Sequence, residues 1–126
     1  MALSNAAKNA LLDHYLKGSA MAQPTNVHLS LHTGDPGTTG ANEVAGGSYA
    51  RQLLNSAFAA ASGGSKASNA VVDFTGMPAV GGSGVTHSGI WLDGVFWQGQ
   101  ALSAAKVVNA GDTFRFPVAS LTATLT

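Results

Sequence analysis

The first apolar pattern along the chain has helical spacing. Ser4 is a favourable N-cap residue, because its side-chain oxygen can accept a hydrogen bond from a free backbone N–H of the first turn. Lys17 suits the negative end of a helix, and Gly18 is placed as the residue that terminates it. We therefore predict one helix within residues 1–18, with one face that docks on an apolar surface. That face is a stripe of Ala7, Leu11, Leu12, Tyr15 and Leu16.

From Val27 onward the apolar period changes to two. Residues 27–32 (VHLSLH) alternate apolar and polar side chains, which is typical of a half-buried antiparallel strand. The dipeptide Asp93-Gly94 lies between two apolar runs, and this arrangement predicts a two-residue hairpin. Further strands are expected between turns rich in glycine. Their ranges are 48–54, 57–61, 69–75, 85–92, 95–102, 113–118 and 121–125, although 57–61 could be helical by propensity.

Several short strands separated by Gly-rich turns indicate an antiparallel β-sandwich or a closed barrel. We favour a mainly β fold, a jelly-roll-like sandwich over residues 27–126 with one N-terminal α-helix over residues 1–18. The 126 residues suit a single domain, and no linker or internal repeat divides them.

The composition excludes several classes of protein. Six acidic and six basic residues give a formal net charge of zero, so no basic surface for nucleic acid or an anionic membrane is expected. The chain has 16 glycines and no cysteine, which removes disulfides and thiolate metal sites. Neither a signal peptide nor a membrane-spanning segment is predicted, and we expect synthesis in a cytoplasm. Low charge also leaves little repulsion between copies, which favours self-association.

No catalytic, cofactor-binding or metal-ligating constellation is predicted. His28 and His32 would lie roughly 13 Å apart at about 3.3 Å per residue of strand, too far to share one ion, and we expect surface or interface histidines. His87 and Ser88 are neighbours in a strand and must point to opposite faces, so they cannot act as base and nucleophile. Three of the six carboxylates stand in turns, where they are expected to cap the local backbone: Asp35, Asp93 and Asp112.

Aromatic residues beside the hairpin turn are the remaining candidate site. Phe96 and Trp97 are adjacent, so one should be buried and the other partly outside. An exposed tryptophan could stack on a sugar or anchor a protein partner, whereas burial of both tryptophans in a core is the alternative. As possible interface residues we name Tyr49, Arg51, Trp91 and Trp97.

Three parts of the chain together resemble a family of small virion proteins of tailed bacteriophages, described as tail fibre or decoration proteins. They are residues 2–13 (ALSNAAKNALLD), residues 31–37 (LHTGDPG) with 42–44 (NEV) and 47–52 (GSYARQ), and residues 108–113 (VNAGDT). The resemblance implies a non-enzymatic building block of the phage particle, and it transfers no catalytic residue.

Two positions on the virion compete within this class. A capsid decoration or cement protein would stabilise the head, with further copies of itself, as a trimer, and the major capsid protein as partners. A tail fibre, collar or baseplate component would contact other tail proteins or the host surface. Because the chain is short and has neither a repeat nor a fibrous shaft, it cannot be a whole fibre, and we favour decoration. A free sugar-binding module is a third class, which rests on the tryptophans alone.

Overall fold

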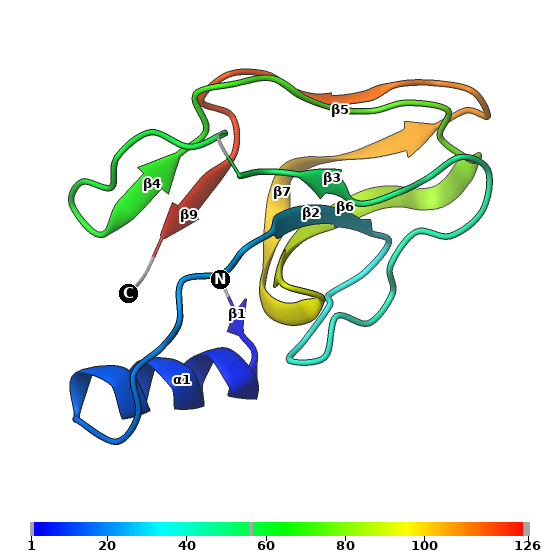
Figure 1. Cartoon of the computed structure of the whole chain (residues 1–126). Helices are drawn as coiled ribbons and strands as arrows, with labels where there is room; N and C mark the ends of the chain where they lie inside the picture. The colour runs from blue at the N-terminus through cyan, green and yellow to red at the C-terminus, as the bar shows by residue number, and fades with distance from the viewer. Residues whose placement is uncertain (1, 56, 125–126) are drawn as a thin grey trace.

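A computed structural model describes residues 2–55 and 57–124 of the chain (Figure 1). The fold is mainly β with antiparallel sheets and one N-terminal helix, so the predicted fold class is confirmed, and the sheets of the described residues do not close into a barrel. The elements in chain order are β1 (Ala2–Leu3), α1 (Asn5–Tyr15), β2 (Val27–His32), β3 (Gln52–Leu53), β4 (Ser65–Ala67), β5 (Val72–Phe74), β6 (Val80–Leu92), β7 (Val95–Val108), β8 (Phe114–Phe116) and β9 (Thr122–Thr124).

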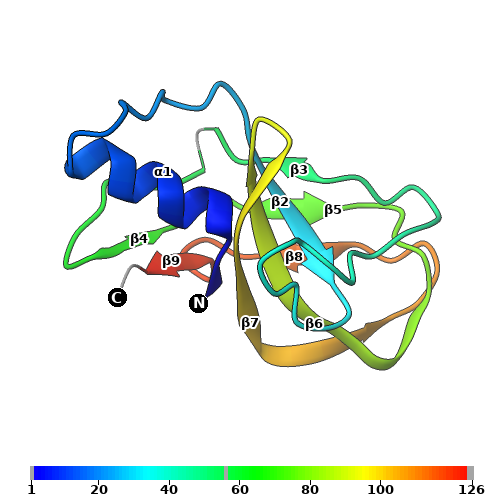
Figure 2. The same cartoon turned by 90° about the horizontal axis from the view of Figure 1, so that it is seen from below.

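The long hairpin of β6 and β7 dominates the larger sheet, whose order is β1-β7-β6-β2-β3. Asp93 and Gly94 form its turn with φ of 48° and 82°, the positive values that a two-residue type I′ turn requires. The hairpin prediction is therefore confirmed. Both strands run beyond their predicted ends. Figure 2 shows that the hairpin bends at the end opposite the turn. Within the register shift between Val80 and Val85, Gly84 lies against the backbone of Lys106 so closely that a Cβ would collide with its carbonyl group.

A second layer, the ribbon of β5 and β8, covers one face of the larger sheet (Figure 1). Asp73 and Arg115 are directly opposite each other in this ribbon and form an exposed ion pair of 2.7 Å. The main core lies between the two layers, with a third ribbon, β4 and β9, beside them. The largest fully buried apolar side chains of this core are Phe74, Leu29, Leu31, Met77, Leu121 and Val85.

Strand β2 is buried on both faces along its second half, which corrects the prediction of a half-buried strand. Leu29 and Leu31 enter the main core, and Ser30 and His32 on the opposite face are also fully buried. The interpretation of His32 as a surface or interface residue is therefore wrong. The cause is the chain after β2, which folds back over the strand: the ring of His32 contacts the carbonyl of Ala41. The alternation of apolar and polar residues cannot by itself predict that a loop covers the polar face of the strand.

Helix α1 begins as predicted and ends one residue earlier. The Ser4 Oγ accepts a hydrogen bond from the backbone N–H of Ala7 at 3.1 Å, so the N-cap is confirmed. The terminating residue with positive φ is Lys17 (65°), not Gly18. The N–H of Gly18 instead donates to the carbonyl of Asp13, five residues earlier, which is the outer hydrogen bond of a Schellman motif.

Several segments form less strand than their patterns indicate: 69–75 is reduced to β5 and 113–118 to β8, and two others are reduced further. Residues 57–61 contribute only an isolated bridge between Phe58 and Ser68, and the strand expected over 48–54 is reduced to β3. In the segment 48–54 a turn takes the place of the first residues, where the Tyr49 N–H donates to the Gly46 carbonyl at 3.2 Å, and the Tyr49 ring stacks on Phe74 with ring centroids 5.9 Å apart. In the last predicted strand, residues 125 and 126 lie outside the described part of the chain.

Candidate functional site

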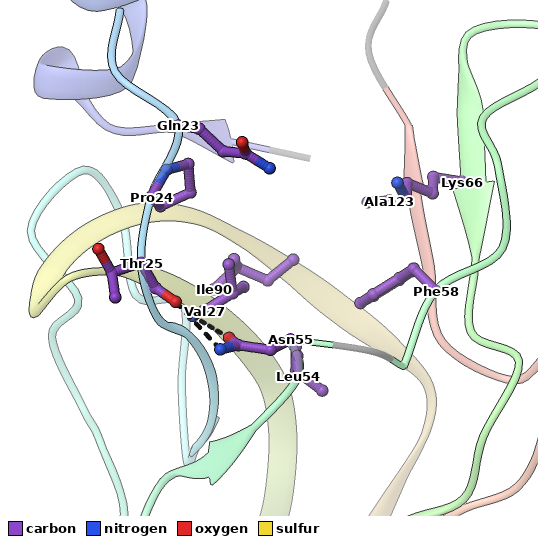
Figure 3. Close-up of a pocket in the computed structure, with 10 residues that line it drawn as sticks. All are labelled: Gln23, Pro24, Thr25, Val27, Leu54, Asn55, Phe58, Lys66, Ile90 and Ala123. Carbon is purple, nitrogen blue, oxygen red and sulfur yellow. Dashed lines mark hydrogen bonds between the residues drawn. The ribbon is translucent and has the colours of Figure 1, made fainter.

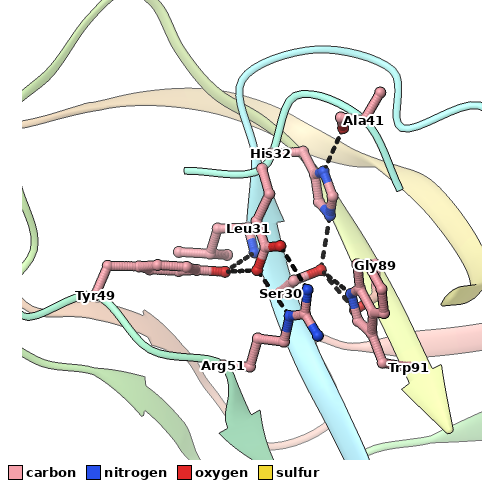
Figure 4. A network of polar contacts seen from close by, with 9 residues as sticks. Ser30, Leu31, His32, Ala41, Tyr49, Arg51, Gly89 and Trp91 are labelled. Atoms are coloured by element: carbon pink, nitrogen blue, oxygen red, sulfur yellow. Dashed lines mark hydrogen bonds and ion pairs between the residues drawn. The ribbon is translucent and has the colours of Figure 1, made fainter. Parts of the chain in front are cut away.

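A buried polar network crosses the second face of β2 (Figure 4). The Ser30 Oγ lies 2.7 Å from His32 Nε2, and His32 Nδ1 lies 2.7 Å from the carbonyl oxygen of Ala41. The indole Nε1–H of Trp91 donates to the same Ser30 Oγ at 2.8 Å. The carbonyl can only accept, so Nδ1 carries the proton and Ser30 donates to Nε2. Three elements are joined in this way: β2, the loop after it, and β6.

The pair of Ser30 and His32 has the contacts of a nucleophile and its base, but not the access. Both residues have an exposed fraction of 0%, so no substrate can approach the hydroxyl. Desolvation by burial lowers the pKa of His32 below its ordinary value of 6.5, and this burial effect outweighs the raising effect of the bond to Ala41. The imidazole is therefore held neutral, as a structural hydrogen-bonding group.

Sequence reasoning missed this pair, although a signal was present. Ser30 and His32 are two residues apart in a strand and so must share a face. The pair that was considered, His87 and Ser88, does lie on opposite faces: His87 is opposite His32 and Ser88 is opposite Leu31. The ring of His87 instead contacts the hydroxyl of Thr86 at 2.8 Å.

The second half of the network is an ion pair that fastens the loop at its far end. Glu43 accepts two hydrogen bonds from the Arg51 guanidinium, at 2.8 and 2.9 Å, and a third from the Tyr49 hydroxyl at 2.9 Å. That hydroxyl in turn accepts from the backbone N–H of Leu31 at 3.0 Å, in the part of β2 where β3 does not pair. A side chain thus replaces a missing strand neighbour.

The charges of this half are set by their partners. Desolvation raises the pKa of Glu43, but the bonds from Arg51 and Tyr49 outweigh it, and the pKa lies below the ordinary 4.5. Burial also raises the pKa of Tyr49 far above its usual range, so its hydroxyl stays protonated and able to donate. Bidentate pairing between arginine and a carboxylate adds geometric specificity to the attraction of the charges.

Arg51 and Trp91 connect the two halves. The Arg51 guanidinium carbon lies 3.4 Å from the centroid of the Trp91 ring, a close cation–π contact. The indole also makes an edge-to-face contact with the Phe96 ring, with ring centroids 5.2 Å apart. One continuous set of contacts therefore runs from Tyr49 to His32.

Two glycines, Gly89 and Gly40, leave the space that this set of contacts occupies. A Cβ at Gly89 would lie 2.7 Å from Ser30 Oγ and 2.8 Å from His32 Nε2, and a Cβ at Gly40 would lie 2.8 Å from the Trp91 ring. Gly89 stands opposite Ser30 in the sheet. Glycine at these two positions leaves the space that Ser30, His32 and the Trp91 ring occupy.

The predicted interface residues fall into two groups. Tyr49, Arg51 and Trp91 belong to the network and are half-buried within the chain. Trp97 lies apart from it: a register shift after Ile90 leaves it as an extra residue of β7, and its carbonyl accepts the N–H of Ser4 at 2.8 Å. Phe96 is buried and Trp97 is half-exposed, so the expectation that one would be buried and the other partly outside is confirmed. A contact between any of the four and a partner stays a prediction.

A groove of about 440 Å³ opens at the other end of β2, between the start of that strand and the ribbon of β4 and β9 (Figure 3). Asn55 shapes one wall: its side chain accepts from the N–H of Val27 at 2.8 Å and donates to the carbonyl of Thr25 at 3.0 Å. The Asp93 carboxylate holds the same segment through the N–H groups of Thr25 and Asn26, rather than its own turn. Asp35 and Asp112 do cap local backbone, as predicted.

Within 2–55 and 57–124, no three His, Cys, Asp or Glu side chains come close enough together to hold an ion. No helix in these ranges is long and apolar enough to cross a membrane.

The fold and the network define a class of small, mainly β protein in which the polar side chains of the network hold the protein's own loops in place. Comparison with protein families gives the more particular assignment. The family model described as "Podophage GP4 fiber I protein gp80" matches residues 2–124, nearly the whole chain, and the chain belongs to this family of phage structural proteins. The resemblance to virion proteins of tailed phages is thereby confirmed. The comparison with curated proteins gave no match.

Proposed function

We propose that this protein is a non-enzymatic fibre component of a bacteriophage particle. The observation that carries the proposal is the family match over residues 2–124, whose description names a podophage fibre protein. The described residues have no shaft of their own, so the chain would be one building block of a fibre and not the whole appendage.

The polar network supports a mechanical role. The side chains that could do chemistry, Ser30 and His32, are closed off from solvent, and Arg51 is committed to Glu43 and Trp91. Such satisfied networks rigidify a fold and specify one arrangement of it. A module that keeps its loops fixed suits repeated contacts with neighbouring virion proteins.

Capsid decoration, which the sequence favoured, is the second candidate. Its support is the small, mainly β fold of the described residues, since a decoration protein has to be compact and abundant. The family description favours the fibre instead. In the fibre proposal the partners are tail proteins and further copies of the chain; in the decoration proposal the major capsid protein takes the place of the tail proteins.

Copy number per particle separates the two proposals. We would count the protein in purified particles by quantitative mass spectrometry against the major capsid protein, and locate it by electron cryomicroscopy. A fibre component should be present in a small multiple of the tail symmetry, and particles lacking it should fail to adsorb while their heads keep full heat resistance. A copy number that follows the capsid lattice, with heads that lose heat resistance first, would establish decoration instead.

A further inference from the structure

The first residues of the chain form an arm that is attached to the body of the molecule at one end. We call residues 2–16, which comprise β1 and α1, the N-terminal arm. β1 pairs with the edge of β7, and the Ser4 N–H donates to the Trp97 carbonyl at 2.8 Å. Ser4 and Ala7 are buried, whereas every residue from 12 to 23 is exposed. The arm is therefore held at its start, and only part of the predicted apolar stripe docks.

The chain reverses its direction directly after the arm (Figure 2). The Met21 N–H donates to His14 Nδ1 at 3.1 Å, so the chain runs back beside the last turn of α1. Lys17 makes this reversal with φ of 65°, a left-handed conformation that is unfavourable for a residue with a Cβ. The neighbouring Gly18 would adopt it without that cost. Folding the arm back onto its own chain therefore places backbone strain at Lys17.

The chain is fixed again just before β2. The Asp93 carboxylate accepts hydrogen bonds from the N–H groups of Thr25 and Asn26, and the Asn55 side chain donates to the carbonyl of Thr25. Residues 17–24 thus connect two rigid parts, the helix and the start of a clamped strand. A short segment between rigid elements that absorbs a large change of backbone dihedrals is a hinge.

The length of this connection allows the arm two positions. Residues 17–26 span about 33 Å when extended. The helix, with 11 residues, is about 16 Å long, so the connection has to return over that length for the arm to reach its own sheet. The sheet order places β7 and β6 between β1 and β2, a separation of about 14 Å. Folded back, the connection serves its own chain; extended, it carries the arm toward a second copy.

We propose that the N-terminal arm is exchanged between copies, so that β1 and α1 of one chain occupy the edge of β7 in a second chain. The occupant is defined by the structure itself, because the arm of the same sequence already fits this edge. Exchange keeps the strand pairing, the bond from Ser4 and the buried position of Ala7, and it releases Lys17 from its left-handed conformation. Exchange of an identical element is a route to oligomers with little cost.

Concentration and hinge strain decide between the two forms, since their contacts between arm and body are the same. The tether gives the arm a high effective concentration at its own sheet, on the order of millimolar. The strain at Lys17 acts in the opposite direction. Exchange therefore prevails where copies are held close together, as neighbouring subunits of a particle are.

Single cysteines detect the exchange, because the native chain has none. Leu3 lies directly opposite Gln98, a pairing at which two cysteines come within reach of a disulfide. We would mix the full chain carrying Leu3→Cys with the full chain carrying Gln98→Cys at high concentration, oxidise the mixture and identify the linked peptides by mass spectrometry. Exchange predicts a heterodimer joined between position 3 of one chain and position 98 of the other.

The ribbon of β5 and β8 supplies the matched control. Asp73 and Arg115 also lie directly opposite each other, and both are at the surface. Neither strand of this ribbon belongs to the arm, so a mixture of Asp73→Cys with Arg115→Cys should give only the heterodimer that random collision produces. The arm mixture should exceed this control at least about tenfold, because effective concentrations in a docked contact are in the millimolar range.

Hinge variants test the part assigned to Lys17. Lys17→Gly should lower the yield of exchanged heterodimer about fivefold, because glycine removes the cost of the left-handed conformation. Lys17→Ala keeps that cost and changes only the charge, so it should exchange like the native chain. Deletion of residues 20–23 leaves about 10 Å of chain to return along a helix of about 16 Å. This variant should be exchanged, and not monomeric, by light scattering at every concentration.

The proposal is wrong if the arm mixture gives no more heterodimer than the control mixture, if Lys17→Gly and Lys17→Ala exchange equally, or if the deletion variant is a folded monomer. The cysteine mixtures are decisive by themselves, because they use full chains with one substitution each. None of these results depends on where the protein sits on the particle.

Discussion

At the scale of single residues, the space left by absent side chains decides which polar groups can meet. Gly89 is the clearest case, because the hydroxyl of Ser30 and the ring of His32 occupy the volume where a Cβ would stand. Close-packed protein interiors lose stability when even a single carbon atom is added. The network therefore depends as much on Gly89 as on its hydrogen-bonding members.

Gly89→Ala should destabilise the protein by about 1–3 kcal/mol, because an added methyl must displace buried atoms of β2. Gly81→Ala in the same strand is the matched control: a Cβ there meets nothing within 4 Å, and a change of at most about 0.5 kcal/mol is expected. The free energy of unfolding in urea measures both. Equal values for the two variants would show that the packing around Gly89 is loose.

The buried imidazole predicts a specific dependence of stability on pH. The pKa of His32 is lowered in the folded state, so the unfolded chain binds more protons once the pH falls below about 6.5. The stability contributed by neutral His32 is then complete above that pH and is lost as the pH falls toward the folded-state pKa.

Urea unfolding at about pH 7.5 and about pH 5.5 tests this dependence. The native chain should lose stability between the two values, His32→Gln should lose less, and His28→Gln should behave like the native chain. The carboxylate of Glu43 acts in a lower window, because its lowered pKa makes its contribution disappear only as the pH falls below about 4.5. A pH response unchanged in His32→Gln would assign the dependence to another group.

At the scale of elements, α1 is attached at one end and on one side. The burial of Ala7 and the half-burial of Leu11 define the attached side, while Leu12 is 45% exposed. Docking of the whole stripe, as its spacing predicts, would have made all five residues equally important for the stability of one chain. The structure divides them between the body of the chain and its surface.

Ala7→Asp should therefore cost about 3 kcal/mol or more, because an unpaired charge would be buried, whereas Leu12→Asp should cost less than about 1 kcal/mol. Thermal unfolding at low protein concentration, where association is absent, is the appropriate measurement. If the two variants unfolded at the same temperature, the attached side would have been assigned wrongly.

The sequence predicts those features of the elements that depend on local signals, and misses those that depend on contacts between distant parts of the chain. Asp93-Gly94 and Ser4 are local signals, set by backbone conformation and by one hydrogen bond, and both were predictable. The burial of His32 was not, because it depends on residues 40–41 lying across β2, a contact between parts of the chain whose sequence carries no periodic trace. Lys17 shows the smaller error: the αL position fell on it rather than on the adjacent glycine.

At the scale of the whole molecule, the chain divides into a fixed part and a loosely held part. The loop from 33 to 51 is closed on itself by the bond from the Thr33 N–H to the Asn42 carbonyl, and it is bound to β2 by the bond from the Val44 N–H to the Leu31 carbonyl and by the network of side chains. Within the described part of the chain, the end of α1 is held by the bonds of Leu16 to the Leu12 carbonyl and of Gly18 and Ser19 to the Asp13 carbonyl, and by the contact of His14 with the N–H of Met21. Local opening should begin at the helix end.

Hydrogen exchange followed by NMR should resolve these two parts. The amides of Thr33 and Val44 should exchange only through global unfolding, while those of Leu16 and Ser19 should exchange orders of magnitude faster through local opening. Slow exchange at the end of α1 in a dilute monomer would show that the helix is docked within its own chain.

The close approach of Ser30 and His32 to Gly89 also restricts which substitutions the sequence can accumulate during evolution. An added side chain at position 89 costs less once position 30 or 32 has become smaller, and the reverse substitutions are favoured in the opposite order. The contact of Gly99 with Pro36 imposes the same condition on a second pair. Natural variants should therefore show substitutions at 89 together with 30 or 32, and at 99 together with 36, with few lineages that carry only one member of the change.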